Sequence, residues 1–447
     1  TSESYPITSD VNTDNKRRLV DGNIYGGCCE SGVVNGNIII NLNASIVERF
    51  KLFDEVEKNA DDGEDRLYGD NPLHHDQYKI TERRTGVIMS EQGMDVLGKA
   101  LNVFGGGKGA ATEIWGSTTI NMNKGYVFQV FGGSEEGIIG KPGTNGELIQ
   151  NDAYSCYVNL KGAAPGVSKK ETYNENMPEC EFIYGGSFMG KIAGNTVVRL
   201  GNGRIFNSFA GSCYADILGH TETYIGYRHT YKDETGNEVT VDGFPWVRDY
   251  TYGGNDLGGQ IWGTKNYADR LNEGTISKIY GYTNENQNPY QLTASAYTEY
   301  RQGRAVGIFG GAYGTYDYKS EYNSYTNQPF LGNAFINFRP TNTDELKSNV
   351  NNVIDEIYGA GQGYPGDGDA DKMQNSSYIL IDIPQEMNNF KNMKVFGAGA
   401  WSGLGIKENV PADGSEAARN GVSAIIDLVH GQLATAYGGS YREGVTR

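Results

Sequence analysis

The sequence predicts an all-β chain built as a parallel β-solenoid, and three observations lead to this prediction. Glycine provides 63 of the 447 residues, roughly twice its usual share of about 7%, whereas proline is scarce at 12. Aromatic residues reach 11%, with 31 tyrosines, so a disordered or collagen-like chain is not expected. A short motif also recurs along nearly the whole chain, which is typical of repeat proteins.

The motif is a β-branched or apolar residue, an aromatic residue, glycine, and then glycine or alanine. Its eleven candidate copies have their aromatic residue at Tyr25, Phe104, Phe131, Tyr184, Phe209, Tyr252, Tyr280, Phe309, Tyr358, Phe396 and Tyr437. The copies at Tyr252, Tyr280 and Tyr437 are partial, and the copy at Phe209 is a looser variant. The shortest spacings are 25 to 29 residues. This unit is too long for one hairpin and suits one coil of two or three short strands.

The residue types of the motif predict a strand followed by a corner. The apolar and aromatic residues suit a strand, and we expect the glycine pair to adopt the positive φ of a sharp turn. Stacked coils would bring the aromatic residues into register as a ladder. Short β-rich runs at 34–42, 116–122 and 194–200 predict further strands between the motifs.

Two segments interrupt the pattern. Residues 44–98 combine helical spacing at 45–53 with the acidic run 61–65, so we expect an excursion that contains a short helix. Residues 341–353 are a second candidate helix.

The charge of the chain excludes some partners. The net charge is −17 and the isoelectric point is about 4.8, so the field of the chain repels phosphate backbones and anionic membranes. Nucleic acid is therefore not an expected partner. No apolar run approaches the 18 or more residues of a membrane span, so none is expected in this chain.

The five cysteines favour neither a zinc site nor a complete disulfide framework, because their number is odd and no CxxC pair occurs. Cys156 and Cys180 are 24 residues apart, which would place them on adjacent coils and permit a bridge. The favoured interpretation is two buried thiols that act as small hydrophobic residues.

The VFGGG and IYGGS copies, at 103–107 and 183–187, together with the GNTVVRL strand at 194–200, resemble a known group of proteins. They resemble the Gly-rich right-handed parallel β-helices of large bacterial surface proteins, of the adhesin-like and autotransporter-passenger-like kind. The resemblance covers roughly residues 20–445. It implies export, an extracellular or cell-surface location, and a role in contact.

The expected organisation is a lead-in at 1–19 followed by one right-handed parallel β-helix at 20–447, with about eleven coils and insertions at 44–98 and about 341–353. Both ends of the chain look processed or truncated, so the chain is expected to belong to a larger exported protein or assembly.

Tyrosines gather just after one motif, at Tyr313, Tyr316, Tyr318, Tyr322 and Tyr325. Tyrosine combines a rigid ring with a hydroxyl, so such a loop can form a contact surface for a glycan or a protein. The alternative, which we favour for these residues, is that the rings cover the solenoid or pack within the loop.

Asp367, Asp369 and Asp371 alternate as in the first part of a calcium loop. The rest of such a loop is missing, because Lys372 stands where glycine is needed and Tyr378 where a bidentate acid is needed. An acidic solvated turn is therefore favoured over a calcium site, and no other cofactor is expected.

Trp246, Arg248, Asp249 and Asp256 lie within eleven positions around one motif. A ring, a guanidinium and two carboxylates could bind and cleave a sugar chain, since glycoside hydrolysis needs two acids and elimination needs a base. The favoured interpretation is a loop in which Arg248 pairs with neighbouring acids and Trp246 acts as an anchor.

The sequence therefore predicts a non-catalytic surface module for adhesion or display that binds glycan or protein through Tyr-rich loops. One alternative is a polysaccharide lyase or hydrolase on the same fold. Another is a structural segment of a surface fibre or layer, which exposed coils at both ends would favour.

Overall fold

The computed structural model describes residues 23–43, 102–166, 177–233, 235–267, 293–314, 332–341, 353–363, 376–402, 404 and 424–442. Within these ranges the regular structure is β, apart from one short 3-10 helix, η2 (Asp152–Tyr154). The predicted all-β class is therefore confirmed for the described part of the chain.

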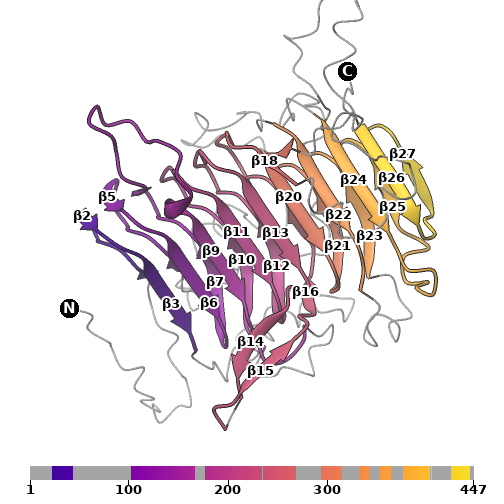
Figure 1. Cartoon of the computed structure of the whole chain (residues 1–447), viewed down its shortest axis with the longest axis horizontal. Coiled ribbons are helices and arrows are strands. Elements are labelled where there is room, and N and C mark those ends of the chain that lie inside the picture. The colour runs from indigo at the N-terminus through magenta and orange to yellow at the C-terminus, as the bar shows by residue number, and fades with distance from the viewer. Residues whose placement is uncertain are drawn as a thin grey trace, which may run out of the picture.

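Two long sheets of parallel strands extend along the molecule and face each other (Figure 1). Sheet A contains β1 (Ile24–Tyr25), β4 (Asn102–Phe104), β7 (Tyr126–Phe131), β10 (Glu179–Tyr184), β12 (Gly203–Phe209), β17 (Tyr250–Tyr252), β21 (Ala305–Phe309), β23 (Ile354–Tyr358), β25 (Lys394–Phe396) and β27 (Thr435–Tyr437), with β16 (Pro245–Val247) also paired to β12. Sheet C contains β3 (Ile38–Leu42), β6 (Thr118–Met122), β9 (Cys156–Leu160), β11 (Thr196–Leu200), β13 (Thr221–Ile225), β20 (Ala296–Tyr300), β22 (Ala334–Phe338), β24 (Ser377–Asp382) and β26 (Ala424–His430).

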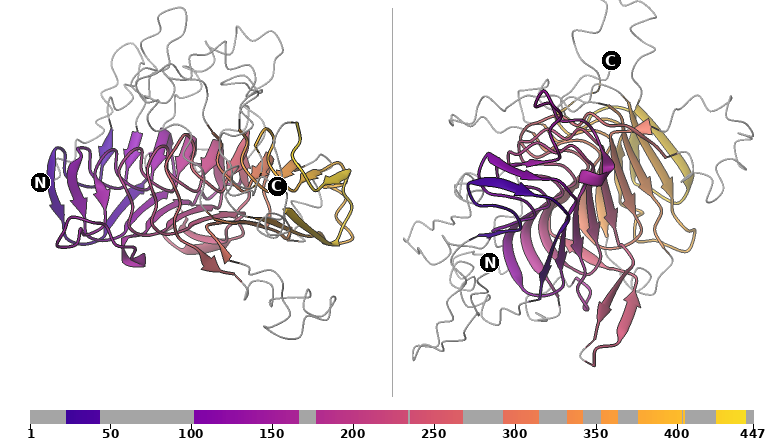
Figure 2. Two further views of the ribbon diagram at one scale, coloured as in Figure 1. Left: turned by 90° about the horizontal axis from the view of Figure 1, so that it is seen from above. Right: turned by 60° about the vertical axis from the view of Figure 1, so that its left-hand side comes forward.

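The chain alternates between the two sheets, and each sheet keeps its strands in chain order. One strand of sheet A and the next strand of sheet C therefore form a repeat, and successive repeats follow one another along the long axis (Figure 2). This arrangement is compatible with the predicted parallel β-solenoid.

Smaller elements complete the fold. Sheet B joins β2 (Ser31–Val34), β5 (Ala111–Ile114) and β8 (Ile138–Ile139), and isolated bridges continue its row from Ile139 through Ile192 and Ile217 to Ile261. Two antiparallel pairs stand apart from the long sheets, namely β14 (His229–Lys232) with β15 (Glu238–Val241) and β18 (Lys265–Asn266) with β19 (Thr293–Ala294).

The main core lies between sheets A and C. Both sheets alternate inward and outward side chains, and the inward ones are mostly valine, isoleucine and leucine. Val130 and Ile183 of sheet A and Val158 and Leu200 of sheet C are all fully buried in it. A second row, with Ile139, Ile192, Ile217 and Ile261 among its members, follows sheet B.

A ladder of ten aromatic rings runs along sheet A and confirms the prediction made from the motif. Neighbouring rings are 4.4–5.2 Å apart between centroids and 3–11° from parallel. The ladder consists of Tyr25, Phe104, Phe131, Tyr184, Phe209, Tyr252, Phe309, Tyr358, Phe396 and Tyr437. The looser copy at Phe209 and the partial copies at Tyr252 and Tyr437 thus belong to it, whereas Tyr280 lies outside the described residues.

The expected positive φ of the motif glycines is wrong. The positive-φ glycines lie at other positions, such as Gly125 and Gly203. The first motif glycine is instead required by close approach, because a Cβ on Gly132 would overlap the carbonyl oxygen of Gly185 in the next repeat. The amide of Gly132 also donates to the carbonyl of Tyr184 at 2.9 Å, so the backbones of adjacent repeats meet at this point.

None of the five cysteines, all of which lie in the described ranges, forms a disulfide. Cys156 lies on β9 against the isoleucine row, and Cys180 lies on β10 in the main core. The disulfide considered from their spacing is therefore absent, and the interpretation as buried small hydrophobic residues is confirmed. Burial raises the pKa of the Cys156 thiol to about 12.

The two predicted interruptions cannot be compared with the structure, because residues 44–101 and 342–352 lie outside the described ranges. The helices expected at 44–98 and 341–353 therefore stay predictions.

We predict that Gly132→Ala destabilises the fold by about 1–3 kcal/mol, because the new methyl group forces two repeats apart. Urea unfolding followed by circular dichroism measures this. Gly438→Ala is the matched control, since no described atom lies within 4 Å of a Cβ at that position. Equal unfolding midpoints for the two variants would contradict the close-approach explanation.

Candidate functional site

The outer face of sheet C holds two rows of residues in register across its first four strands. One row, the amide row, consists of Asn41, Asn121, Asn159 and Arg199. The neighbouring row consists of Ile39, Thr119, Tyr157 and Val197. We call these eight positions on β3, β6, β9 and β11 the open face.

Hydrogen bonds connect the members of the amide row. The Nδ2 of Asn121 donates to Oδ1 of Asn41 at 2.9 Å, and the Nδ2 of Asn159 donates to Oδ1 of Asn121 at 3.0 Å. The Nη1 of Arg199 donates to Oδ1 of Asn159 at 3.3 Å. A primary amide has two N–H groups, so Asn121 and Asn159 each donate one within the row and keep a second for a ligand or water. Asn41 enters the row as an acceptor, through its Oδ1.

Tyrosine rings flank the arginine end of the row. The Arg199 guanidinium lies 5.2 Å from the Tyr157 ring centroid and 5.3 Å from that of Tyr227. Tyr227 is 37% exposed, so part of its ring is accessible. The open face includes no carboxylate, although the whole chain has a net charge of −17.

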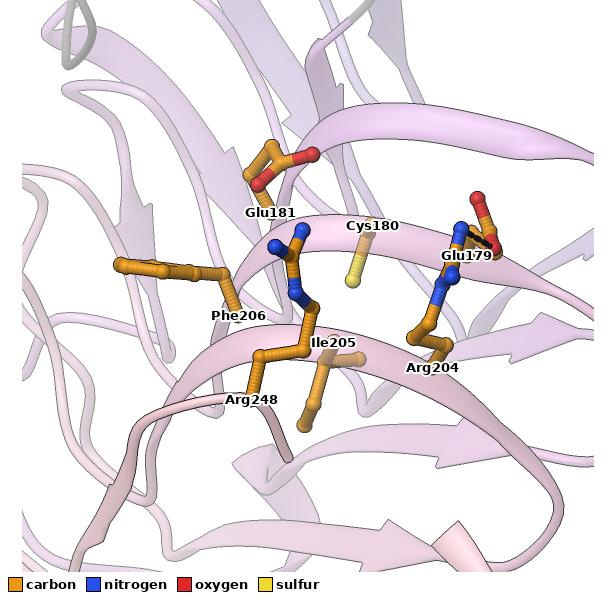
Figure 3. A pocket seen from close by; sticks show the side chains of 7 residues that line it. All are labelled: Glu179, Cys180, Glu181, Arg204, Ile205, Phe206 and Arg248. Atoms are coloured by element: carbon orange, nitrogen blue, oxygen red, sulfur yellow. Dashed lines mark ion pairs between the residues drawn. The ribbon is translucent and has the colours of Figure 1, made fainter. Parts of the chain in front are cut away.

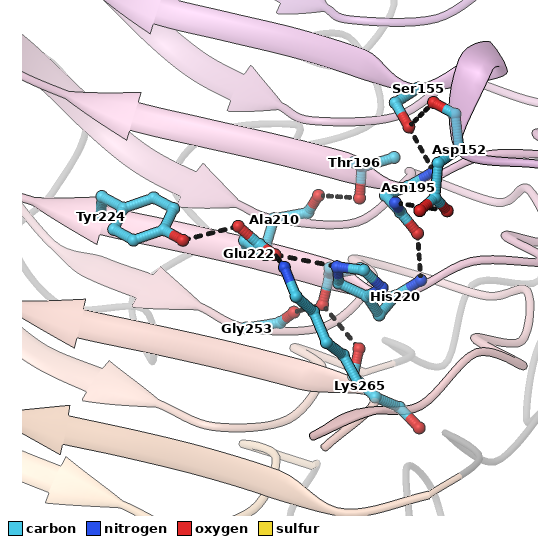
Figure 4. Close-up of polar contacts among 12 residues, drawn as sticks. Asp152, Ser155, Asn195, Thr196, Ala210, His220, Glu222, Tyr224, Gly253 and Lys265 are labelled. Carbon is cyan, nitrogen blue, oxygen red and sulfur yellow. Dashed lines mark hydrogen bonds and ion pairs between the residues drawn. The ribbon is translucent and has the colours of Figure 1, made fainter. Parts of the chain in front are cut away.

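A charged cluster marks the end of the open face (Figure 4). Glu222 on β13 follows Val197 in the register. Its carboxylate accepts hydrogen bonds from Nε2 of His220 at 2.8 Å, the hydroxyl of Tyr224 at 2.6 Å and Nζ of Lys265 at 2.9 Å. Burial alone would raise the pKa of Glu222, but these three contacts outweigh it and lower the pKa to about 2.

This cluster stabilises structure and is poorly suited to proton transfer. A carboxyl group with a pKa of about 2 stays ionised near neutral pH, whereas an efficient acid or base has a pKa near the working pH. Val197, the last member of its row in the open face, is already buried, and beyond the cluster the outward positions are apolar and buried, at Tyr297, Phe335 and Tyr378. Tyr267 stacks on Tyr297 at 4.2 Å.

A second polar cluster lies on sheet A and contains Trp246 and Arg248, two of the residues singled out from the sequence. Figure 3 shows Arg248 with its neighbours. The indole of Trp246 lies 5.6 Å from the Arg204 guanidinium and 5.8 Å from that of Arg248. Arg204 forms an ion pair with Glu179 at 2.5 Å, and both side chains are almost completely buried. Glu181 lies above Arg248 in the same view and is 2% exposed.

Trp246 and Arg248 thus lie together, and Glu179, Glu181 and Arg204 are their neighbours. Strand register brings these residues together, because Glu179 pairs with Arg204, and Arg204 with Trp246. The sequence could not reveal this group, since β10, β12 and β16 come from different repeats.

Of the two aspartates predicted near Trp246, Asp256 has other surroundings, whereas Asp249 contacts Phe206, which lines the same pocket as Arg248. Asp256 accepts a hydrogen bond from the Tyr184 hydroxyl at 2.9 Å and lies 3.8 Å from the Cys213 thiol, so it lies beside the aromatic ladder. Asp249 is buried, and its amide donates to the carbonyl of Phe206 at 3.0 Å.

The tyrosine segment is described only at its beginning. Tyr313 is 6% exposed and packs edge-on against Phe209 and Tyr252, so its ring contributes to the core beside the ladder. The remaining predicted contact and calcium residues, Tyr316, Tyr318, Tyr322, Tyr325, Asp367, Asp369 and Asp371, lie outside the described residues. Among the residues that are described, no group of three or more His, Cys, Asp or Glu side chains could hold a metal ion.

Comparison of the chain with protein-family models, curated proteins and solved structures found no match. The described ranges also contain no helix with the length and apolar character needed to cross a membrane. Inference about function therefore depends on the surfaces described above.

We predict that Glu222→Gln costs about 2–3 kcal/mol of stability at pH 7, because three donors lose a charged acceptor. The pKa of Glu222 is lower in the folded state than the usual value near 4.5, so its contribution is complete above pH 4.5 and is lost as pH falls toward 2. Urea unfolding of both proteins between pH 7 and pH 2.5 measures this.

The difference between wild type and Glu222→Gln should shrink over that acidic window. Glu238→Gln, on the exposed hairpin, is the matched control and should change stability little at either pH. A difference that is constant with pH would show that Glu222 does not contribute through its charge.

Proposed function

We propose that the chain is a single right-handed parallel β-helix of about eleven coils that acts as a non-catalytic module for adhesion or surface display. It works outside the cell or at a bacterial cell surface, and it binds glycan along the open face of sheet C. The parallel register of sheets A and C and the aromatic ladder support the fold.

The amide row is the main observation in favour of a glycan as the ligand. Sugar hydroxyls both donate and accept hydrogen bonds, and a primary amide offers both functions in one plane. Adjacent strands are about 4.8 Å apart, which is comparable with the length of one sugar unit in an extended polysaccharide. Asn41, Asn121 and Asn159 can therefore meet successive units of one glycan chain.

The charge of the chain favours a neutral glycan, because a net charge of −17 repels an acidic polysaccharide. The single charged side chain of the open face, Arg199, lies against Tyr157 and Tyr227, and these rings supply apolar contacts for a sugar. The amides are oriented by one another before any ligand arrives, so binding costs little side-chain entropy.

The alternative of a polysaccharide lyase or hydrolase would use the cluster on sheet A. Arg204 and Arg248 could neutralise the carboxylate of an acidic sugar, and Trp246 could stack on its ring. The near-complete burial of Glu179 and Glu181 makes this cluster less suited to catalysis than to structure, because a general base must reach its substrate.

Two other proposed sites complete this function. The segment with Tyr316, Tyr318, Tyr322 and Tyr325 supplies a second contact surface for glycan or protein. Asp367, Asp369 and Asp371 supply a weak calcium site. Neither proposal depends on the open face.

The test is retention of the chain on immobilised neutral and acidic polysaccharides, scored together with the release of reducing or unsaturated ends. We expect retention on a neutral polysaccharide without released ends. Asn121→Ala/Asn159→Ala should weaken binding about thirtyfold, since about 1 kcal/mol is lost per amide and about 1.4 kcal/mol corresponds to a factor of ten. Gln150→Ala, an exposed amide with a hydrogen bond to Asp152, is the matched control.

Each other result has a defined meaning. Weaker binding by Tyr316→Ala/Tyr318→Ala with unchanged binding by the asparagine variant would move the contact surface to the tyrosine segment. Released ends would overturn the non-catalytic proposal and direct attention to Arg248, Asp249 and Asp256. Absence of retention on every polysaccharide would overturn glycan binding.

A further inference from the structure

At the two ends of the described repeat stack, no further described strand is paired. At one end β1, β2 and β3 each pair with a strand on one side only, and at the other end β26 and β27 do the same. Large apolar side chains are exposed on these strands, with exposed fractions of 47% for Val33, 66% for Ile39, 43% for Leu428 and 51% for Tyr437. Unpaired parallel strands of this kind can add a further strand.

Gly438 indicates more specifically that a further repeat can stack on the last described one. Along the stack, a Cβ on the first motif glycine would overlap the next repeat, as at Gly26 against Gly105, Gly359 against Gly397 and Gly397 against Gly438. At Gly438 itself no described atom lies within 4 Å of such a Cβ. The last described repeat therefore keeps the residue that stacking requires, at a position where no described residue stacks on it.

The ends match each other in sheet A. The pairings between β4 and β1 and between β25 and β27 use the same register. Continuing that register past β27 places Tyr437, Gly438 and Gly439 against Tyr25, Gly26 and Gly27 of a second copy. The ring of Tyr437 then meets another ring, as at every earlier step of the ladder.

The ends also match in sheet C. Its register runs unbroken from Ile38 of β3 to Ala424 of β26. Continuing it places apolar residues on apolar ones in a second copy, with Ile425 on Ile39, Ile426 on Ile40 and Leu428 on Leu42. In the same alignment the carboxylate of Asp427 meets the amide of Asn41, which can donate to it.

We propose that a second copy of this chain binds head to tail, with β26 and β27 of one copy pairing with β3 and β1 of the next. The contact joins two different surfaces, so it does not close on itself and can be repeated to form a filament. It depends on the strand register and is independent of the glycan proposal.

The experiment is sedimentation velocity of the full chain over a concentration series. We expect the sedimentation coefficient of the wild type to rise with concentration. Gly438→Ala should remain monomeric over the same range, and its thermal unfolding midpoint should equal that of the wild type at a concentration low enough for the wild type to be monomeric. A wild type that is monomeric throughout, or a Gly438→Ala variant that associates as strongly, would overturn the proposal.

A mixing experiment tests the polarity of the contact. Ile39→Asp blocks the opposite end, because the new carboxylate lies beside Ile425 and Asp427 of the second copy, and Ile39 is exposed in the monomer. Each variant alone should be monomeric, and an equimolar mixture should form heterodimers and nothing larger. A mixture that stays monomeric would exclude a head-to-tail contact.

Discussion

The close approach of backbones at the motif glycine is the contact on which the rest of the structure depends. The amide of Gly132 reaches the carbonyl of Tyr184 at 2.9 Å, and there is no room for a Cβ between that glycine and Gly185. Because the same contact recurs from repeat to repeat, the strands of both sheets hold one register and the aromatic rings stack face to face. The glycine thus sets the repeat spacing, and the ring beside it contributes apolar burial.

A constant register has a direct effect on the outer surface. Residues at equivalent positions of successive repeats become neighbours even when they are far apart in the chain, as Asn41 and Asn121 are. The same effect assembles the ion pair between Glu179 and Arg204 and brings Trp246 beside it. Polar rows on this molecule are therefore properties of the stack and cannot be assigned to one strand alone.

The sequence was sufficient to predict the β class, the parallel arrangement and the ladder, because the motif repeats the same residue types at each step. The reason inferred for the glycines was wrong, since composition does not distinguish a positive φ from a close approach. The amide row was missed, although the apolar–Asn–apolar pattern at 40–42, 120–122 and 158–160 was its signal. The variable distance from each motif to that pattern concealed it. Trp246 and Arg248 were found together because they lie on one strand and its end, whereas their buried acidic neighbours lie in an earlier repeat.

The alternation of the chain between two sheets also determines where this protein can accept insertions. The connection between β3 and β4 spans residues 43–101, yet β4 pairs with β1 in the same register that shorter connections produce elsewhere. Lengthening a connection raises its closure entropy only slowly, and each repeat contacts mainly its immediate neighbours. The segments between strands can therefore be replaced. A new recognition loop can be inserted at such a junction while the strands on either side keep their partners.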